Sequence, residues 1–150
     1  MNAIVRLASL DDLPEIVTLM KDHASYERAD FTAHGLASRL RKAMKGCNPR
    51  LTVFLLEVDK AVVGYCSVAM EFSSWKARDY LHMDCLFIRA DMRGGNLGKL
   101  LFSYVRRFAE ELNIEEVQWQ TPDWNDSAIQ FYERIGAKHS AKRRFHYKVL

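Results

Sequence analysis

Ala90-Asp91-Met92-Arg93-Gly94-Gly95-Asn96-Leu97-Gly98-Lys99 is the stretch that decides the fold of this chain, because it joins two different patterns. The apolar run at residues 85–88 precedes it and is typical of a buried strand. Apolar residues at spacings of three and four follow it and predict a helix over residues 97–112: Leu97, Leu100, Leu101, Tyr104, Val105, Phe108 and Leu112. The glycines therefore lie where a strand ends and a helix begins.

This glycine loop has the chemistry of a phosphate cradle. The first turn of a helix carries unpaired backbone N–H groups and a partial positive charge. Glycine lets an anion approach the backbone closely and permits positive φ. The loop therefore predicts a site for phosphate, most simply the pyrophosphate of a cofactor, with a plain turn before a helix as the open alternative. The P-loop and the dinucleotide-binding pattern do not fit, because the glycine spacings that define them are absent.

Composition indicates one soluble globular domain spanning residues 1–150. Hydrophobic residues make up 49% and charged residues 27% of the 150 positions. No apolar run approaches the roughly 20 residues that span a membrane, and residues 1–6 lack a signal-peptide pattern. Cys47, Cys66 and Cys85 are odd in number and widely spaced, which predicts a reducing cytoplasm and neither a disulfide framework nor a metal site. A net charge of +3 with scattered basic residues predicts no nucleic-acid partner.

The remaining patterns predict a mixed α/β architecture around one sheet. Strands are expected at residues 4–7, 51–58, 61–72, 80–88, 116–121 and 145–150. A first helix is expected from Leu13 after a capping box at residues 9–12, with Asp11 as the alternative cap. Further helices are expected from Thr32 to near Gly46, over residues 97–112, and from Asn125 or Asp126 to Ile135. Residues 24–30 and 73–78 are expected loops, Asp59-Lys60 a hairpin turn and Gly64 a bulge. We expect a mostly antiparallel sheet of six to seven strands flanked by about four helices.

Two blocks of this sequence resemble the GNAT acyltransferases, the GCN5-related N-acetyltransferases. Residues 93–98, Arg-Gly-Gly-Asn-Leu-Gly, are similar to the family's acetyl-CoA loop Arg/Gln-x-x-Gly-x-Gly/Ala, with Asn96 where glycine is usual. Asn is the residue next most tolerant of a left-handed backbone. Residues 125–137 are similar to the family block Asn-x-x-Ala-x-x-Phe-Tyr-x-x-x-Gly-Ala. The blocks have the family's order and separation, and the resemblance implies the GNAT fold over the whole chain.

The resemblance implies acetyl-CoA as co-substrate, and no metal. It assigns the pantetheine chain to the strand edge, the pyrophosphate to the loop, and further contacts to the start of the last helix. The implied cofactor-binding residues are Leu86, Phe87, Ile88, Arg93, Gly94, Gly95, Asn96, Leu97, Gly98, Lys99, Asn125, Ser127 and Ala128. For Lys99, simple solvation is an equal alternative.

Within the family, the chain looks most like the diamine acetyltransferases, which include spermidine/spermine N-acetyltransferase. That likeness implies a small primary amine as acceptor and a homodimer, with residues 145–150 as the candidate interface strand. The implied substrate-binding residues are Tyr26, Glu27, Trp75, Asp84 and Gln120. The chain departs from the subgroup at Asp84-Cys85, where the subgroup has a paired Glu-Asp.

Acetyl transfer to an amine needs a base and an acid, and Asp84 and Tyr132 are the catalytic candidates. An alkyl ammonium has a pKa near ~10.4, so it must lose a proton before it attacks. Asp84 as a structural ion-pair partner and Tyr132 as a packing residue are the alternatives. Strand alternation predicts that Cys85 faces away from Asp84 as a core thiol. His82 is expected on the side of Asp84, as an exposed strand-end residue or an auxiliary base.

These observations predict an N-acetyltransferase that transfers the acetyl group of acetyl-CoA to a small polyamine or amino-acid-like amine. The expected route is direct attack within a ternary complex. The alternatives that stay open are a non-catalytic acyl-CoA-binding sensor or interaction module, and an acetyltransferase acting on a protein amine or an aminoglycoside-type amine.

Overall fold

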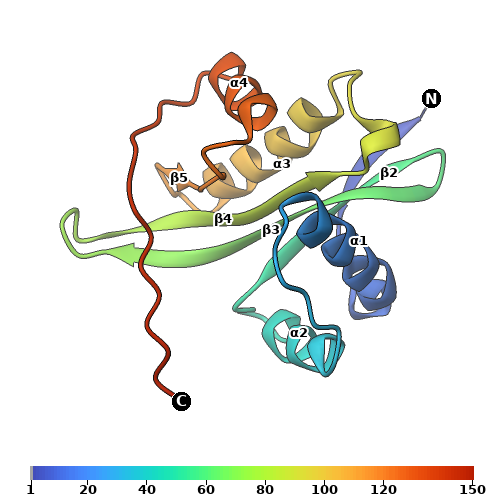
Figure 1. The fold of residues 1–150 in the computed structure, drawn as a ribbon, viewed down its shortest axis with the longest axis horizontal. Helices are drawn as coiled ribbons and strands as arrows, with labels where there is room; N and C mark the ends of the chain where they lie inside the picture. Colours follow the sequence, from blue (N-terminus) through green and yellow to red (C-terminus); the bar gives the residue numbers. More distant parts are fainter. Residues whose placement is uncertain (1) are drawn as a thin grey trace. The chain divides into compact units, whose positions relative to one another are not determined.

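The computed structural model describes residues 2–150, which form two compact units divided between Gln120 and Thr121 (Figure 1). The first unit contains a sheet and three α-helices: β1 (Ala3–Leu7), η1 (Leu10–Asp12), α1 (Leu13–Tyr26), α2 (Leu36–Met44), β2 (Thr52–Val58), β3 (Ala61–Ser73), β4 (Arg78–Ile88), η2 (Ala90–Met92), α3 (Leu97–Glu111) and β5 (Val117–Gln118). The second unit, Thr121–Leu150, contains α4 (Asp126–Arg134).

The sheet has the order β1-β2-β3-β4-β5 and is antiparallel except for its last pair. β2 and β3 are joined by the predicted Asp59-Lys60 turn, in which both residues have positive φ, 49° and 73°. Such a turn matches the right-handed twist of a hairpin. β4 and β5 are parallel and pair only at Leu81 with Val117 and at His82 with Gln118. The predicted mixed, mostly antiparallel sheet is confirmed.

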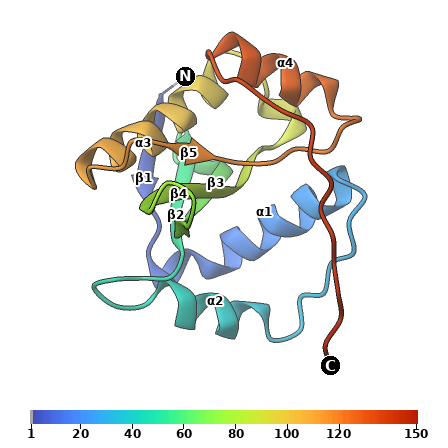
Figure 2. The same cartoon turned by 90° about the vertical axis from the view of Figure 1, so that its left-hand side faces the viewer.

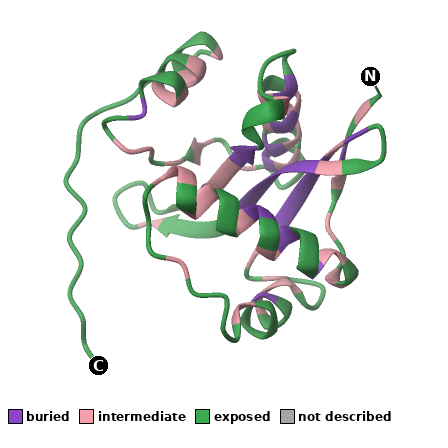
Figure 3. Ribbon diagram, turned by 45° about the vertical axis from the view of Figure 1, so that its right-hand side comes forward, coloured by how far each residue is buried: buried purple, intermediate pink, exposed green. Residues whose placement is uncertain are grey.

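Helices cover both faces of the sheet within the first unit, as predicted (Figure 2). The face covered by α1 and α2 buries a cluster that includes Ile16, Leu40, Leu55 and Phe87. On the other face, α3 buries Leu97, Leu101 and Val105 of the predicted stripe together with Ala109, whereas Leu112 of that stripe is exposed. Figure 3 shows buried residues concentrated along the central strands. Each buried aliphatic side chain contributes about 1.5–3 kcal/mol to this packing.

Two β-bulges interrupt the ladders next to β3. Leu56 pairs with Gly64 while Glu57 pairs with Val62, so Val63 is the extra residue, directly before the predicted bulge position Gly64. Ser67 pairs with Cys85 while Val68 pairs with Met83, so Asp84 is the extra residue of β4. A bulge bends its strand and redirects the side chains that follow.

Four sequence-based expectations about the elements were wrong. The sheet has five strands rather than six or seven, because residues 145–150 form no strand: Phe145, Tyr147 and Val149 are exposed and pair with no strand of residues 2–150. α1 continues through Tyr26, so its last turn occupies part of the expected loop. α2 begins after Gly35, whose left-handed backbone (φ 67°) breaks any helix started at Thr32. β5 has two residues instead of the six expected at 116–121.

Arg6 ties the first strand to its neighbours. Its guanidinium donates to both carboxylate oxygens of Asp12 at 2.8 and 2.7 Å, and to Glu57 Oε1 at 2.6 Å. Asp12 also accepts from the backbone N–H of Ser9, which completes the predicted capping box. The hydrogen bonds from Arg6 hold the pKa of the Asp12 carboxyl well below its usual range.

We expect Asp12→Asn to lower the free energy of unfolding at pH 7 by about 1–2 kcal/mol, because charge-assisted bonds to Arg6 are lost. A carboxyl with a lowered pKa in the folded state contributes stability above its unfolded pKa, and the contribution disappears as the pH falls. The difference between wild type and variant therefore shrinks below about pH 4. Urea unfolding at pH 7 and pH 3 measures both values.

Asp22→Asn, on the exposed surface of α1, is the matched control and should leave unfolding unchanged. Equal destabilisation by the two variants would contradict a specific role for the Arg6–Asp12 pair.

Candidate functional site

The glycine loop has the open, left-handed backbone that its sequence predicts. Gly94, Gly95 and Asn96 have φ values of 104°, 54° and 66° in succession. Cβ atoms built at the two glycines would meet nothing within 4 Å, so open space borders the loop. α3 starts directly afterwards, and its first-turn N–H groups at Gly98 and Lys99 have no intrahelical acceptor. The loop thus presents backbone donors and a helix N-terminus to an open surface.

The strand that leads into the loop has a free edge. β5 pairs with β4 only at Leu81 and His82, so Leu86, Phe87 and Ile88 have no strand partner on that side among residues 2–150. On the other side, β3 approaches closely: a Cβ at Gly64 would lie 2.7 Å from the Phe87 carbonyl oxygen. An unpaired strand edge offers alternating N–H and C=O groups to an extended ligand.

Arg93 is held against the protein on the α1 side of the loop. Its Nε donates to the Ile88 carbonyl at 2.9 Å, and its guanidinium carbon lies 4.2 Å from the centre of the Tyr26 ring and 5.5 Å from that of Phe87. This cation–π contact joins the loop to the end of α1. The sequence predicted Arg93 as a ligand of the cofactor and Tyr26 as a ligand of the substrate. The structure brings these two residues together.

Asp84 protrudes from the β4 bulge, and its side chain is 59% exposed. His82 Nε2 lies 3.7 Å from one Asp84 oxygen, and the Cys85 thiol donates to the other at 3.7 Å. The prediction that His82 lies on the side of Asp84 is confirmed, but His82 is only 18% exposed instead of lying at an exposed strand end. The prediction that Cys85 faces away from Asp84 was wrong, because the bulge breaks the strict alternation of the strand.

Cys85 is a partly buried thiol. It packs against the core cluster of α1 and α2. Burial raises the pKa of the Cys85 thiol to about 11. Because the thiolate is the reactive form, a raised pKa argues against Cys85 as an acyl-carrying nucleophile.

His23 is a site residue that the sequence interpretation missed. It lies on α1, its Nδ1 is 2.9 Å from the Tyr65 hydroxyl, and its Nε2 is 3.3 Å from Glu27 Oε1. The imidazole stacks on Phe87 with ring centres 4.9 Å apart. Burial lowers the pKa of His23. The i,i+4 spacing of His23 and Glu27 was the available signal, once α1 was known to reach Tyr26.

Trp75 and Gln120, the other predicted acceptor-site residues, lie outside the helices and strands. Trp75, in the loop between β3 and β4, is 98% exposed, so it contacts neither Asp84 nor Glu27. Gln120 lies two residues after β5.

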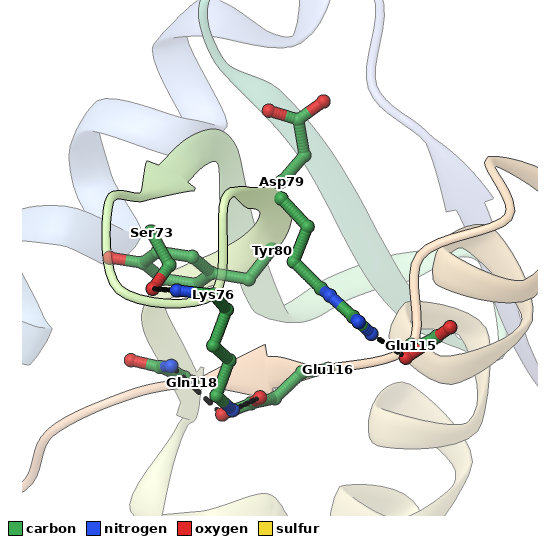
Figure 4. Close-up of a pocket in the computed structure, with 8 residues that line it drawn as sticks. Ser73, Lys76, Asp79, Tyr80, Glu115, Glu116 and Gln118 are labelled. Carbon is green, nitrogen blue, oxygen red and sulfur yellow. Dashed lines mark hydrogen bonds and ion pairs between the residues drawn. The ribbon is translucent and has the colours of Figure 1, made fainter.

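A charged hollow of about 360 Å³ lies between the base of the β3–β4 loop and β5 (Figure 4). Ion pairs join Lys76 to Glu116 and Arg78 to Glu115, so most of the charged groups that line the hollow are already neutralised. Asp79 points away from these pairs in Figure 4.

The remaining predicted residues lie in the second unit, where α4 begins as expected. The Asn125 side chain caps the helix, accepting from the Ala128 N–H at 3.4 Å and from the Ser127 hydroxyl at 3.2 Å. Tyr132 is half-buried on α4, and its ring centre lies 5.3 Å from that of Phe131.

Comparison with known proteins identifies relatives over most of the chain. A family model described as "Acetyltransferase (GNAT) family" matches residues 16–137. The thialysine N-epsilon-acetyltransferase of Caenorhabditis elegans is 25% identical over 83% of this chain and 76% of its own length. The L-ornithine N5-acetyltransferase NATA1 of Arabidopsis thaliana is 26% identical over 89% of this chain and 78% of its own length.

Solved structures share the fold. An aminoglycoside acetyltransferase, meta-AAC0020, from an uncultured soil metagenomic sample superposes with a TM-score of 0.81 at 18% identity, covering 99% of this chain and 96% of the other. A possible acetyltransferase from Clostridium difficile 630 superposes with a TM-score of 0.83 at 18% identity, covering 100% and 99% of the two chains. The family match spans well over half of the sequence and includes both blocks that suggested it. The chain belongs to the GNAT family of acetyltransferases.

Proposed function

We propose that this enzyme transfers the acetyl group of acetyl-CoA to a small primary amine by direct attack within a ternary complex. The observation that carries the proposal is Asp84, an accessible carboxylate on a bulge of the strand that runs into the left-handed glycine loop. Asp84 thus lies four residues before the end of β4, and the glycine loop follows that strand after η2.

The geometry of the first unit supports the proposed cofactor contacts. The free β4 edge at residues 86–88 suits the amides of a pantetheine chain, and residues 94–99 suit the pyrophosphate. Lys99 is exposed in the first turn of α3 and adds positive charge there. Asn125, Ser127 and Ala128 are proposed to contribute further contacts from the start of α4.

Asp84 is the proposed base and Tyr132 the proposed acid. An amine with a pKa near ~10.4 arrives protonated, so a carboxylate must take its proton before nitrogen attacks the thioester carbon. The C–N bond forms as the C–S bond breaks, and a phenol supplies a proton to the departing thiolate.

The acceptor is proposed to be a polyamine or an amino acid with a side-chain amine. The relatives are named for thialysine and L-ornithine, each of which carries a second amine beside its α-amino group. Glu27 and Asp84 place two carboxylates near His23, and a cation with two amines has two charges to match them. A protein amine is the alternative acceptor.

Residence in the cytoplasm and a homodimer complete the proposal. No helix among residues 2–150 is long and apolar enough to cross a membrane, and the three cysteines are free thiols. Three apolar side chains near the end of the chain are largely exposed: Phe145 at 88%, Tyr147 at 91% and Val149 at 81%. They alternate with polar residues, a pattern typical of a strand that pairs with another chain. Sedimentation equilibrium tests the dimer, and a monomer at every concentration would contradict it.

The first experiment measures thiol release from acetyl-CoA with spermidine, putrescine, thialysine, L-ornithine, an aminoglycoside and a lysine-containing peptide. We expect turnover with the diamines or diamino acids, and little with the peptide. Turnover with the peptide alone would reassign the acceptor to protein. Tight acetyl-CoA binding without turnover of any amine would favour a sensor module.

Asp84→Asn should lower kcat/KM about 100-fold or more at pH 7, because no carboxylate remains to accept the amine proton. The variant's rate should then rise with pH as free amine accumulates toward its pKa near ~10.4. Steady-state kinetics from pH 6 to pH 10 measures this, with Asp22→Asn as the control. A pH profile identical to that of wild type would remove Asp84 from the mechanism.

Tyr132→Phe should lower kcat about tenfold or more while the Kd for acetyl-CoA stays near the wild-type value, because only the proton donor is removed. Tyr104→Phe, on α3, is the matched loss of a hydroxyl. An unchanged kcat in Tyr132→Phe would exclude the phenol as the acid.

A further inference from the structure

We propose that His23 positions the Glu27 carboxylate to bind the second, non-reacting ammonium group of a diamine acceptor, and so determines the preference for diamines over monoamines. This inference rests on the proposed function, since it concerns the part of the acceptor that does not react. His23 is a positioning residue, because it acts on the acceptor through Glu27. Neither the glycine loop nor the C-terminal block assigns it a role.

The imidazole of His23 is held in one orientation by β3 and β4. Its Nδ1 lies 2.9 Å from the hydroxyl of Tyr65, a residue that is 1% exposed. Its ring stacks on Phe87, with ring centres 4.9 Å apart and ring planes 20° apart. The other ring nitrogen, Nε2, is therefore held in a fixed place, where it lies 3.3 Å from Glu27 Oε1.

The charge of Glu27 selects the tautomer of His23. An ionised carboxylate only accepts hydrogen bonds, so the ring proton belongs on Nε2, the nitrogen that faces it. Nδ1 is then an acceptor, and the Tyr65 hydroxyl donates to it. In this state the imidazole is neutral. It directs an N–H group toward Glu27 and leaves the carboxylate its full negative charge.

The backbone of Glu27 is fixed as well as its side chain. Glu27 ends α1, and its N–H donates to the His23 carbonyl at 2.9 Å. Beyond it, Arg28 has a left-handed backbone (φ 57°), and the Ala29 N–H donates back to the Ala24 carbonyl at 2.9 Å. These are the features of a Schellman motif, here with arginine where glycine is usual. The carboxylate therefore projects from a rigid helix end.

Glu27 lies where a negative charge is locally unfavourable. The C-terminus of a helix carries a partial negative charge, which repels an acidic side chain placed there. Among residues 2–150, no lysine or arginine forms an ion pair with Glu27, and its side chain is 33% exposed. A carboxylate that breaks a local rule in this way, beside a neutral imidazole, suits a cation from outside the chain.

The register of β4 places Asp84 near the same group of side chains. Phe87, on which the His23 ring stacks, lies three residues from Asp84, at most roughly 10 Å along the strand. Cys85 packs in the same cluster as Phe87, and its thiol donates to Asp84 at 3.7 Å. Asp84 therefore lies on the face of the sheet that α1 covers. A chain with two amines can meet Asp84 with one and Glu27 with the other.

The surroundings of His23 decide how this pairing responds to pH. The titratable and charged groups around the ring are Glu27 on α1, Tyr65 on β3, Asp84 and Cys85 on β4, and Arg93 after η2. Burial has the largest effect and lowers the pKa of His23; the guanidinium acts in the same direction, and the two carboxylates oppose it. The phenol and the thiol stay neutral, because burial raises the pKa of each.

A lowered pKa leaves His23 neutral near pH 7, where Glu27 attracts a cation. At a pH below the His23 pKa, the imidazolium neutralises Glu27 and repels the second ammonium. The KM for a diamine should then rise as the pH falls. A monoamine places no charge at Glu27, so the preference for diamines should disappear over the same pH range.

The kinetic test compares putrescine with butylamine, which has the same four carbons and one amine. We expect Glu27→Gln and His23→Phe each to lower the ratio of kcat/KM for putrescine to kcat/KM for butylamine about tenfold or more at pH 7.5, mainly through KM. The first variant removes the charge, and the second keeps a stacked ring but removes both nitrogens. A wild-type ratio near one, or a ratio unchanged in both variants, would overturn the proposal.

His23→Gln separates positioning from packing. Its amide retains an N–H donor and never becomes charged, so it should keep most of the wild-type preference for putrescine at pH 7.5 and should not lose it at low pH. His34→Gln, which changes an exposed histidine, is the matched control. The same loss of preference in His23→Gln and His23→Phe, with no difference in their pH profiles, would contradict positioning through the N–H group.

NMR titration of His23 tests the pairing without turnover. Putrescine and L-ornithine are added separately to wild type and to Glu27→Gln in the presence of CoA. An ammonium group at Glu27 opposes the imidazolium, so each amine should lower the His23 pKa in wild type and not in the variant. A His23 pKa that neither amine moves in wild type would overturn the proposal, even in an active enzyme. If wild type acetylates no amine, the proposed function fails, and a shift that depends on Glu27 would still support the cation site.

Discussion

An extra residue between Met83 and Cys85 changes which side chains of β4 share a face. In a strand without this bulge, Asp84 and Cys85 would alternate across the sheet, and the carboxylate would lie away from Tyr65. With it, Asp84, Cys85 and His82 all face the layer of α1, where His23 and Glu27 lie. The strand then recovers its register, so that Phe87 pairs with Tyr65 and supports the His23 ring. One inserted residue therefore creates the polar cluster while leaving the core on both sides intact.

The glycine loop depends on the same strand from its other end. On one side, β4 pairs with β3, and Gly64 allows the two strands to approach closely at Phe87. On the other side, β5 pairs with only two residues of β4. Ile88 anchors Arg93, and Arg93 lies over Tyr26, so the end of α1 and the start of the loop are joined through the last residues of β4. A movement of the loop would therefore displace the end of α1, next to Glu27.

Periodicity predicted the elements whose stability comes from local pattern and burial: β2, β3, β4, α3 and α4 lie where the sequence indicated, and the loop glycines are left-handed. It failed where long-range pairing decides the outcome. Residues 145–150 have strand-like alternation, but a strand forms only with a neighbour. No glycine marks the bulge at Asp84 in the sequence, so strict alternation predicted the wrong face of the sheet for Cys85. His23 directly precedes the segment that was expected to be a loop. Its helical spacing from Glu27 became apparent only because α1 continues through Tyr26.

The replacement of a carboxylate by Cys85 beside Asp84 has a physical consequence. Two adjacent carboxylates on one face repel each other, and one of them must then be neutralised or paired. A thiol whose pKa burial raises to about 11 stays protonated, so it donates to Asp84 and adds no competing negative charge. In this chain the residue that departs from the diamine acetyltransferase pattern is a neutral donor to Asp84.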